Sequence, residues 1–576
     1  MYLRSTVRHN ADGSQVRYFQ LAENVWDSDK GCAVARVIYN FGRADGLDEQ
    51  ALRRLAASIL RVLPSDQQTA GATSGDDVDQ RGCWPYGAVH ALRSIWEEIG
   101  IDKVMDSKLR VKRTKQPLEL ALFAMVANRC LEPCSKLHCF EHWVRRRVFL
   151  AGSDKLTLQH LYAAMDLLEE HKADVEKAVY FSVADLMSVD VDLIFYDTTS
   201  LHFEIDEEDD AALDKFERDF EPLRKRGKAK NGRDDAPQLV IGLAVTRDGI
   251  PVRSWVFPGN TSDVTTVQKV KNDLRGWKLG RCVFVGDAGM NSEENRRKLA
   301  LGHGKYILAT KVRGGDEVTK EVLTRPGRYH EVQDNLRVKE VVVGDGERRQ
   351  RYVLCHNPDE ATRQSRHRNK LVEQLQQELA SMRPSAKGHT KRMCELLASK
   401  RVGRYLRQGT NCLVVDWEAV RREEHYDGKW VITSNDDTLT AEDLALGYKQ
   451  LMRVEECWRQ LKTGLRMRPV YHWRPWRIEA HVTISMLALL LERVAEIRTK
   501  QPWRHIRDHL ETIQVVEYDR GASRIQQTTR VKIEPASLLL RLKVPMPAKI
   551  HSIKPIDKDE ASDRVEFDEE VAPAAG

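Results

Sequence analysis

The sequence predicts an α/β fold, in which a sheet covered by helices follows an all-helical region and is interrupted by an insertion. Three observations predict this fold. At 576 residues the chain is too long for one hydrophobic core, so several structural units are expected. From Trp84 to about Leu186 the apolar residues recur with a helical period, and short buried β-runs then replace that pattern. This alternation of strands and helices breaks off near Arg313 and resumes after Lys429.

The regions before the sheet differ in their patterning. Residues 1–63 begin with strand-like alternation, in "RYFQLAENVW" and "AVARVIYNFG", and continue into an amphipathic helix, "DEQALRRLAASILRVL". A polar linker is expected over residues 64–82. Residues 83–186 are helical throughout, as in "PLELALFAMVANR". Such a helical unit is a candidate DNA-binding domain, although helical packing alone explains it equally well.

The sheet region, residues 187–312, is predicted to contain three strands, a helix, a strand, a helix and a strand. "VDLIFYDTTS" is a strand ending at Asp197, and "PQLVIGLAVTRDGIPVRSWVFPGN" is a hairpin that turns at Asp248 and Gly249. "RCVFVGDAGM" is a buried strand ending at Asp287. The helices "DVTTVQKVKNDLRGW" and "EENRRKLAL" flank it, and "KYILATKV" is the last strand.

The remaining regions complete the expected organisation. The insertion, residues 313–429, contains the hairpin "VKEVVVGDGERRQRYVLCHN" and a long polar, basic helical stretch. The second part of the sheet region, residues 430–500, begins with "KWVITSND" and "TAEDLALGYKQL". Residues 501–576 carry weaker signals and end in an acidic tail that is expected to be disordered.

Composition limits the class of protein. The longest apolar run, near Ile484–Leu491, is far shorter than the roughly 20 residues of a membrane helix, and the N-terminus lacks the apolar core of a signal peptide. The 10 cysteines form no regular framework, as expected of reduced thiols. We therefore expect a cytoplasmic protein that does not bind membranes.

One cluster contains ligand types that zinc accepts. Its spacing is not that of a CxxC pair and the region is helical, so packing is the favoured interpretation. The cluster consists of Cys130, Cys134, His138, Cys139 and His142.

Positive charge is concentrated in one segment. The net charge of +6 and the pI near 8.6 are compatible with nucleic-acid binding without being diagnostic of it. The segment "RKRGKAKNGR", which includes Lys225, Arg226, Lys228 and Lys230, has no acidic residue and follows the acidic run "EIDEEDD". It is either a solvated loop or a loop that contacts phosphates.

A row of polar residues accompanies an apolar helical stripe in "YKQLMRVEECWRQLKTGLRMRPVYHW", residues 448–473. Tyr448, Glu455 and Lys462 are seven residues apart, and seven steps of about 100° fall about 20° short of two turns. On one continuous helix the phenol, the carboxylate and the ammonium would share one edge. The apolar stripe, which would bury that helix, consists of Leu451, Val454, Trp458, Leu461 and Leu465.

Three carboxylates stand in positions from which they can converge. Asp197 and Asp287 follow buried β-runs, and Glu455 lies on a helix expected to pack across the sheet. Converging carboxylates repel one another unless cations intervene, and hard divalent cations prefer such oxygen ligands. Each residue also has a plainer interpretation: either aspartate can be a turn or cap residue, and Glu455 can pair with Arg459 four residues on.

These motifs resemble those of the DDE transposases of bacterial insertion sequences, whose third acidic residue lies in a Tyr-Arg-Glu-Lys signature, Y-x2-R-x3-E-x6-K. Tyr448, Glu455 and Lys462 fit that spacing, while Leu451 takes the arginine position and Arg453 is the alternative arginine. "YDTTSLHFE", "VGDAGMNSEEN" and "FPGNTSD" also resemble family segments. The resemblance implies an RNase H-like catalytic core interrupted by a strand-rich insertion.

The resemblance further implies cut-and-paste DNA transposition. Asp197, Asp287 and Glu455 would hold two Mg²⁺ or Mn²⁺ ions, activated water would cleave at the terminal inverted repeats, and the freed 3′-hydroxyl would attack target DNA. Tyr448 and Lys462 would hold phosphates, with Arg453 and Arg459 as further DNA contacts. A homodimer on double-stranded DNA and association with the bacterial nucleoid are expected.

Two other functions are compatible with the same residues. One is an RNase H-like nuclease that cleaves DNA without strand transfer. The other is an inactive, transposase-derived DNA-binding protein. The basic insertion and the helical unit favour the transposase, since recognition of DNA ends requires additional binding surface.

Overall fold

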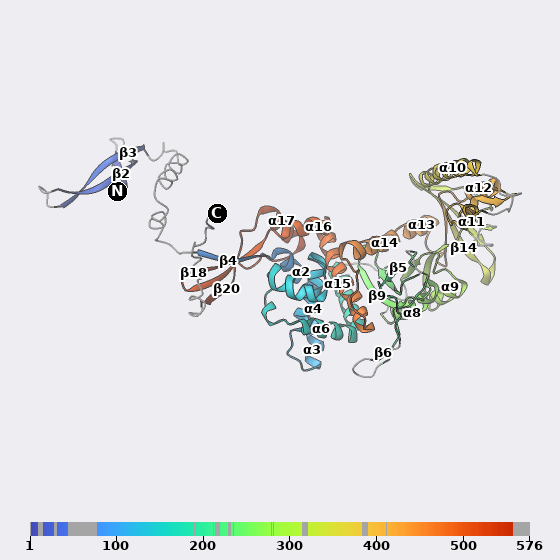
Figure 1. Ribbon diagram of the computed structural model, residues 1–576, viewed down its shortest axis with the longest axis horizontal. Coiled ribbons are helices and arrows are strands. Elements are labelled where there is room, and N and C mark those ends of the chain that lie inside the picture. The colour runs from blue at the N-terminus through green and yellow to red at the C-terminus, as the bar shows by residue number, and fades with distance from the viewer. Residues whose placement is uncertain are drawn as a thin grey trace, which may run out of the picture. The chain divides into compact units, whose positions relative to one another are not determined.

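The computed structural model describes residues 2–9, 15–27, 32–43, 78–187, 192–210, 212–213, 219–228, 232–233, 235–277, 279, 282–313, 321–382, 390–409 and 412–556 (Figure 1). The chain divides into two compact units. One contains Met1–Gln80, Tyr518–Arg524 and Lys554–Gly576, and the other contains Arg81–Glu517 and Ile525–Ile553. Every candidate site residue with a described position lies in the second, larger unit.

The first unit contains an antiparallel sheet with the order β1-β2-β3. Its strands are β1 (Tyr2–His9), β2 (Gln15–Asp27) and β3 (Cys32–Arg43). The two runs of alternating residues at the N-terminus are therefore strands, as predicted. The amphipathic helix expected after them, and residues 64–77 of the expected linker, lie outside the described residues. The end of that linker was predicted wrongly, because Val78–Pro85 is strand β4.

Within the described part of the second unit, a nine-stranded sheet has the order β12-β13-β14-β17-β11-β10-β5-β8-β9. The strands β5, β10 and β11 are parallel to one another, whereas β5, β8 and β9 are antiparallel. The strands are β5 (Leu193–His202), β8 (Gln238–Val245), β9 (Pro251–Pro258), β10 (Val283–Gly286), β11 (Lys305–Thr310), β12 (His330–Gln333), β13 (Leu336–Val343), β14 (Gln350–His356) and β17 (Lys429–Ser434).

Apart from two short paired strands between β5 and β8, β6 (Ala212–Leu213) and β7 (Asp219–Phe220), the chain from β5 to β11 follows the predicted element order. Helix α8 (Asp263–Gly276) lies between β9 and β10, and α9 (Glu293–Ala300) lies between β10 and β11. Ser292 opens α9 as expected, since its side chain accepts a hydrogen bond from Asn295 N. The hairpin between β8 and β9 turns at Gly249, whose φ of 74° is the left-handed conformation that glycine adopts easily.

One strand is longer than predicted. Strand β5 continues past Asp197 to His202, because Thr198 to His202 pair in register with Gly242 to Gln238 of β8. The prediction that this strand ends at Asp197 is therefore wrong. Asp197 lies in mid-strand, where the neighbouring strand β10 is shorter on that side and ends at Gly286.

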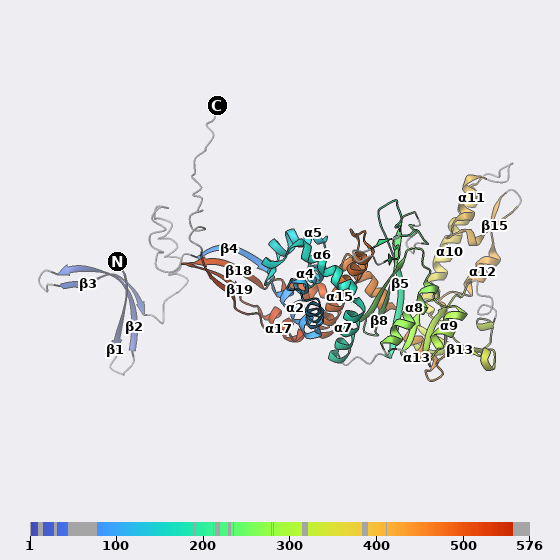
Figure 2. The same ribbon diagram turned by 90° about the horizontal axis from the view of Figure 1, so that it is seen from below.

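The strands of the expected insertion extend the main sheet. Strand β17 lies between β11 and β14, so β12, β13 and β14 continue the same sheet. The segment after β14 has its own small core, which includes Leu371, Leu375, Met393 and Val420. Its elements are α10 (Pro358–Ser381), α11 (Lys391–Ala398), β15 (Leu406–Gln408), β16 (Leu413–Val415) and α12 (Trp417–Glu424), with the helices grouped together in Figure 2.

The N-terminal helices share a core with the rest of the second unit. They pack around α15 (Pro475–Thr499), and the apolar side chains of these helices, α15 and one face of the sheet form one continuous core. Figure 1 and Figure 2 both show α2, α4 and α6 gathered around α15. The helices are α2 (Gly87–Ile99), α3 (Ile101–Val111), α4 (Leu118–Leu131), α5 (Lys136–His138), α6 (Leu158–Glu170) and α7 (Lys172–Met187), with a π-helical segment at Cys139–Arg147.

The C-terminal region contains regular structure up to Pro555, although the sequence signals there are weak. It has helices α16 (Trp503–Leu510) and α17 (Ile533–Leu542) and strands β18 (Gln514–Arg520), β19 (Ser523–Thr528) and β20 (Ile550–Pro555). A sheet with the order β20-β19-β18-β4 is formed here. The acidic tail, residues 557–576, lies outside the described residues. Among the described helices, none is both long enough and apolar enough to cross a membrane.

The packing of α15 leads to the first prediction. Leu487 is 0% exposed, so Leu487→Ala should lower the free energy of unfolding by about 2–5 kcal/mol, through lost burial and the cavity left behind. Denaturant titration measures this change. The control is Ile533→Ala in α17, where the side chain is 90% exposed and the change should stay within about 0.5 kcal/mol. Equal effects of the two substitutions would contradict the central role of α15.

Candidate active site

Asp197 and Asp287 stand on neighbouring parallel strands. Phe195 of β5 is paired with Val285 of β10, and each aspartate lies two residues further along its strand direction. The two residues are therefore at the same level on chains about 4.8 Å apart. Asp287 directly follows β10, as predicted, and its Oδ1 accepts a hydrogen bond from Gly289 N at 2.9 Å. Both carboxylate residues are half-buried.

The signature segment is not one continuous helix, so the predicted geometry of its polar row is wrong. Helix α13 (Ala441–Lys449) ends after Tyr448, and α14 (Met452–Arg459) begins after Leu451. At this junction the backbone bonds close shorter turns, as in Leu451 N to Tyr448 O at 2.9 Å and Val454 N to Leu451 O at 3.1 Å. Tyr448 therefore ends one helix, and Glu455 lies in the first turn of the next.

Despite the break, the charges of all three predicted carboxylates act on the Tyr448 phenol. Burial is the main cause that raises the pKa of Tyr448 above its ordinary value of 10.0, and the negative charges of Asp287, Glu455 and Asp197 raise it further, in that order. The effect of such charges on a pKa weakens with distance, and it weakens further where water reaches the site. All three carboxylates thus act electrostatically on the Tyr448 hydroxyl, and Glu455 is the exposed one of the three.

Helix α13 is held close to the sheet where it carries Tyr448. A Cβ atom at Gly447 would lie 3.4 Å from Ile307 Cδ1 of β11 and 3.7 Å from Leu193 Cδ1 of β5. Both distances are those of ordinary van der Waals contact, so the last turn of α13 packs directly against the two strands. The start of α13 is fixed by a capping box, in which Thr440 and Asp443 satisfy each other's backbone N–H groups.

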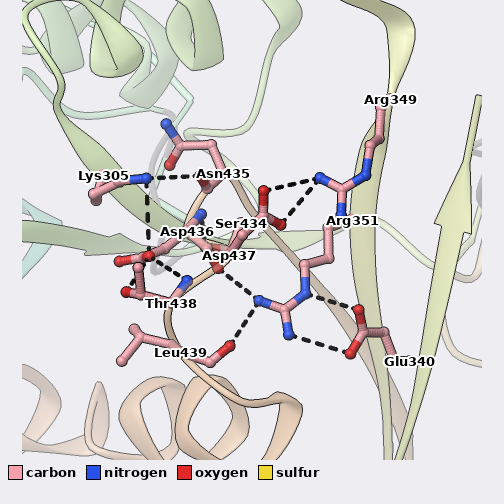
Figure 3. A network of polar contacts seen from close by, with 10 residues as sticks. All are labelled: Lys305, Glu340, Arg349, Arg351, Ser434, Asn435, Asp436, Asp437, Thr438 and Leu439. Atoms are coloured by element: carbon pink, nitrogen blue, oxygen red, sulfur yellow. Dashed lines mark hydrogen bonds and ion pairs between the residues drawn. The ribbon is translucent and has the colours of Figure 1, made fainter. Parts of the chain in front are cut away.

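A polar network anchors the turn that leads from β17 into α13 (Figure 3). The guanidinium of Arg351, which is buried, donates to Asp436 O at 2.6 Å and to Leu439 O at 2.8 Å, and pairs with Glu340 at 2.9 Å. The Asp436 carboxylate in turn accepts hydrogen bonds from the backbone and hydroxyl of Thr438. This network sets where α13 begins and so where Tyr448 lies.

Lys462 lies on a widened turn and reaches β5. After α14 the chain forms a π-helical turn, Gln460–Gly464, closed by Leu465 N donating to Gln460 O at 2.9 Å. The Lys462 ammonium donates to Thr199 Oγ1 at 2.6 Å, two residues beyond Asp197 on β5. The contact places the predicted phosphate-binding ammonium beside the strand that carries the first aspartate.

Asp263 is a fourth carboxylate that the sequence analysis did not single out. It lies at the first position of α8, where its Oδ1 accepts a hydrogen bond from the Thr198 hydroxyl at 2.5 Å. A Cβ atom at Gly289 would lie 3.3 Å from Asp263 Oδ2 and 3.1 Å from Asp287 Oδ1, so these two carboxylates are close. The only sequence signal was its place in "FPGNTSD", which also fits an ordinary helix start.

The predicted basic loop is paired with the acidic run before it. Lys225 donates to Asp209 O at 2.6 Å and lies 3.5 Å from a Glu208 oxygen, and Arg226 N donates to the Glu208 carboxylate at 2.8 Å. These contacts offset much of the positive charge of the loop. Lys228 is exposed, and Lys230 lies outside the described residues.

The two arginines of the signature segment are both exposed. Arg453 pairs with Glu456 at 2.9 Å, which is a surface ion pair between residues three apart. Arg459, at the end of α14, is also exposed. Both side chains face solvent on α14.

The segment after the π-helical turn rests on buried cations. Arg129 of α4 donates to Arg466 O at 2.9 Å, and His481 of α15 donates to Met467 O at 3.0 Å. Lys136, which is 5% exposed, lies in the same cluster, and burial followed by the charge of Arg129 lowers its pKa to about 7. The cations thus sit beneath the chain that immediately follows Lys462.

No ready-made metal cluster occurs in the part of the chain that the structure describes: no three His, Cys, Asp or Glu side chains there are arranged to hold an ion. Of the zinc-compatible cluster, Cys130 and Cys139 are buried in the core, and the rings of His138 and His142 stack 4.4 Å apart. These residues therefore lie in helical packing, as the favoured interpretation expected.

The sequence matches the family model of the transposase DDE domain over residues 210–491. Asp263, Asp287 and Glu455 lie inside this range, and Asp197 precedes it. A second match, to the N-terminal domain of the IS1634 family transposases, covers residues 3–70, which contain the sheet β1-β2-β3. Together the two matches show that the chain belongs to the DDE transposases. Its N-terminal domain further identifies it as a transposase of an insertion sequence.

Comparison with solved structures finds six similar chains. One is the piggyBac transposase in a synaptic complex with hairpin DNA, which is 9% identical, with a TM-score of 0.34. The match covers 73% of this chain and 78% of that chain. No curated protein matches the sequence.

The buried lysine leads to a pH-dependent prediction. Because the Lys136 pKa is about 7 in the folded protein and 10.5 ordinarily, the unfolded chain binds the extra proton between those values. Stability due to this group therefore rises with pH across that window, by up to about 1.4 kcal/mol per pH unit. Lys136→Met should stabilise the protein most below pH 7, and the gain should shrink towards pH 10.

Denaturant titration at several pH values measures this difference. The charged and titratable groups facing Lys136 are Arg129, Cys134 and Cys139, which both proteins retain. The control is Lys391→Met at an exposed position of α11. An increase in the free energy of unfolding that is the same at all pH values would contradict the burial of a charged Lys136.

Proposed function

We propose that this transposase cleaves DNA at the ends of its element by metal-dependent phosphoryl transfer and joins the 3′ ends to target DNA. Asp197, Asp287 and Glu455 are assigned as the catalytic carboxylates. The assignment is supported by the strand pairing that sets Asp197 level with Asp287, and by the electrostatic influence of all three carboxylates on the Tyr448 phenol, in a chain that matches the transposase DDE domain. This is cut-and-paste DNA transposition.

The catalytic core is proposed to be RNase H-like. Support comes from the strand order β9-β8-β5-β10-β11. Strands β8 and β9 form an antiparallel hairpin beside the central strand β5, and β10 and β11 lie parallel to β5 on its other side. Two helices, α8 and α9, connect the strands on this side of the sheet. In this core the first aspartate lies on the central strand and the second follows its parallel neighbour, so their proximity results from strand pairing alone.

The carboxylates suit divalent cations of the hard class. The donor set consists only of carboxylate oxygens, which Mg²⁺ and Mn²⁺ prefer, and the crowding of three negative charges near Tyr448 favours cations between them. We propose that Asp197, Asp287 and Glu455 hold two such ions. When bound, the ions would supply Lewis-acid stabilisation for in-line displacement at phosphorus.

The neighbouring side chains would position the DNA. The Lys462 ammonium, fixed by Thr199, and the Tyr448 hydroxyl can both donate to phosphate oxygens. Because burial and the carboxylates raise the pKa of Tyr448, its phenol stays protonated and remains a donor throughout the physiological range. Arg453 and Arg459 are proposed as contacts to the DNA backbone, since both face solvent on the same helix.

The partners proposed are the inverted-repeat ends and the target DNA, bound by a homodimer that brings two ends together. The basic segment 224–233 is a weaker candidate for DNA contact, because Lys225 and Arg226 are engaged with the acidic run. Cleavage followed by joining to target DNA distinguishes the transposase from a nuclease, which would cleave without joining. Binding without cleavage would indicate an inactive derivative.

Glu455→Gln should abolish cleavage and leave DNA binding largely intact. It removes one negative oxygen from the proposed metal site, and loss of several kcal/mol of transition-state stabilisation corresponds to about a 10³-fold lower rate. Nicking of DNA that carries the cognate ends, with Mg²⁺ or Mn²⁺, measures the effect. The matched control is Glu456→Gln, which alters the next carboxylate, paired with Arg453. Near-normal cleavage by Glu455→Gln would overturn the metal-site assignment.

Lys462→Ala should weaken binding to the cleaved end and flatten its salt dependence. Loss of one phosphate contact lowers the slope of log affinity against log salt by about 1. Thr199→Val should give a smaller change in affinity without the change in slope, since it removes only the hydroxyl that orients the ammonium. An unchanged slope in Lys462→Ala would exclude a phosphate contact at this position.

A further inference from the structure

Two aromatic side chains are displayed to solvent just after the signature segment. Tyr471 is 69% exposed and Trp473 is 61% exposed. Large aromatic side chains are ordinarily buried, because each removes a large apolar area from water. Their exposure side by side in one segment therefore needs a reason, which the proposed roles of Tyr448 and Lys462 do not supply.

The segment that carries them is held rigidly from below. Arg129 and His481 bind the carbonyl oxygens of Arg466 and Met467, so the backbone is fixed although it forms no helix or strand. Between the two aromatics, His472 faces inward, with its ring 6.3 Å from that of Tyr162 and 5.7 Å from that of His481. The side chains thus alternate outward, inward, outward.

This alternation fits the spacing of stacked bases. In an extended chain, residues two apart are separated by about 6.6 Å, which is about twice the 3.4 Å rise between successive bases. Rings at that separation can accept one base between them, or stack on two bases in turn. Stacking on aromatic rings tolerates any base, because every base has a π-face.

Charge favours nucleic acid over an apolar protein partner. The stretch from Arg466 to Arg474 contains three arginines and no acidic residue. The guanidinium of Arg474 lies 5.1 Å from the centre of the Trp473 ring. Beneath the segment, Arg129 is a buried cation, and charge buried in this way attracts anions that approach the surface above it.

The segment runs beside the proposed catalytic strand. Lys462 contacts Thr199 of β5, and Arg468 lies 3.4 Å from the ring of His202, at the end of the same strand. His202 is five residues beyond Asp197, or about 16 Å along an extended strand. That distance corresponds to about five nucleotide steps of duplex DNA. The part of the segment at Arg468 therefore lies beside the strand that carries Asp197, and the aromatics follow it in the chain.

We propose that Tyr471 and Trp473 form a stacking surface for unpaired DNA bases next to the cleavage site. The proposal rests on the proposed function for its location and adds a ligand class, single-stranded nucleotides at an opened DNA end. Trp473, with the larger ring and the neighbouring guanidinium, contributes most of the stacking.

The test compares two DNA probes with the full-length protein in the absence of divalent ions, so that cleavage plays no part. One probe is a short blunt duplex, and the other is the same duplex with a single-stranded tail that carries 2-aminopurine. Trp473→Ala should weaken binding of the tailed probe by about tenfold or more, and binding of the blunt probe by no more than about twofold. Quenching of 2-aminopurine fluorescence should be lost with it.

Three further proteins complete the experiment. Trp473→Phe should retain most of the preference for the tail, and Tyr471→Ala should lose part of it. Trp417→Ala, which removes another exposed tryptophan on α12, should behave as the unaltered protein. Circular dichroism and thermal unfolding confirm that each variant is folded.

Two outcomes would overturn the proposal. One is that Trp473→Ala leaves the binding of both probes unchanged, or weakens the binding of both probes equally. The other is a change confined to self-association, seen by sedimentation, which would assign the surface to contacts between chains. Glu455→Gln tests the proposed function separately: if that variant still cleaves while the tail preference persists, the carboxylate assignment fails and the stacking surface stands.

Discussion

The parallel pairing of β5 with β10 is the constraint on which the candidate site depends. It sets Phe195 opposite Val285, and it thereby brings Asp197 and Asp287 to the same level although they are far apart in the chain. Backbone hydrogen bonds between buried strands are costly to break, since their polar groups would be left without partners. A carboxylate pair built on such strands is held rigidly, as metal-dependent phosphoryl transfer requires.

The third carboxylate is positioned by a chain of tertiary contacts. Arg351 ties the end of β17 to the start of α13, and α13 packs against β5 and β11 at Gly447. The short turns after Tyr448 then redirect the chain into α14, and the π-helical turn brings Lys462 to Thr199. Both departures from regular helix occur beside the candidate site, which is where such irregularities are commonly found. The helix break therefore organises the site instead of disrupting it.

Much of the fold was predictable because it depends on local periodicity. Alternation and buried β-runs predicted the strands and the order of elements from β5 to β11, and the turn at Gly249 was predicted from its residue type. Periodicity does not reveal pairing partners. It therefore placed the end of β5 at Asp197, five residues early, and treated β13 and β14 as part of a separate insertion, although β17 joins them to the main sheet. It also gave no reason to single out Asp263.

The sequence by itself determined the family: the chain is recognisable as a DDE transposase from the order and spacing of Asp197, Asp287, Glu455 and the residues around them. Local chemistry is sufficient for this, because side-chain type and strand or helix period are written residue by residue. The tertiary structure alone decided which groups meet. A helix break separates Tyr448 from Glu455, and the basic run near Lys225 turned back onto its acidic neighbour. Tyr471 and Trp473 came to lie outward over buried cations. Such outcomes depend on contacts between residues far apart in the chain, which no period in the sequence encodes.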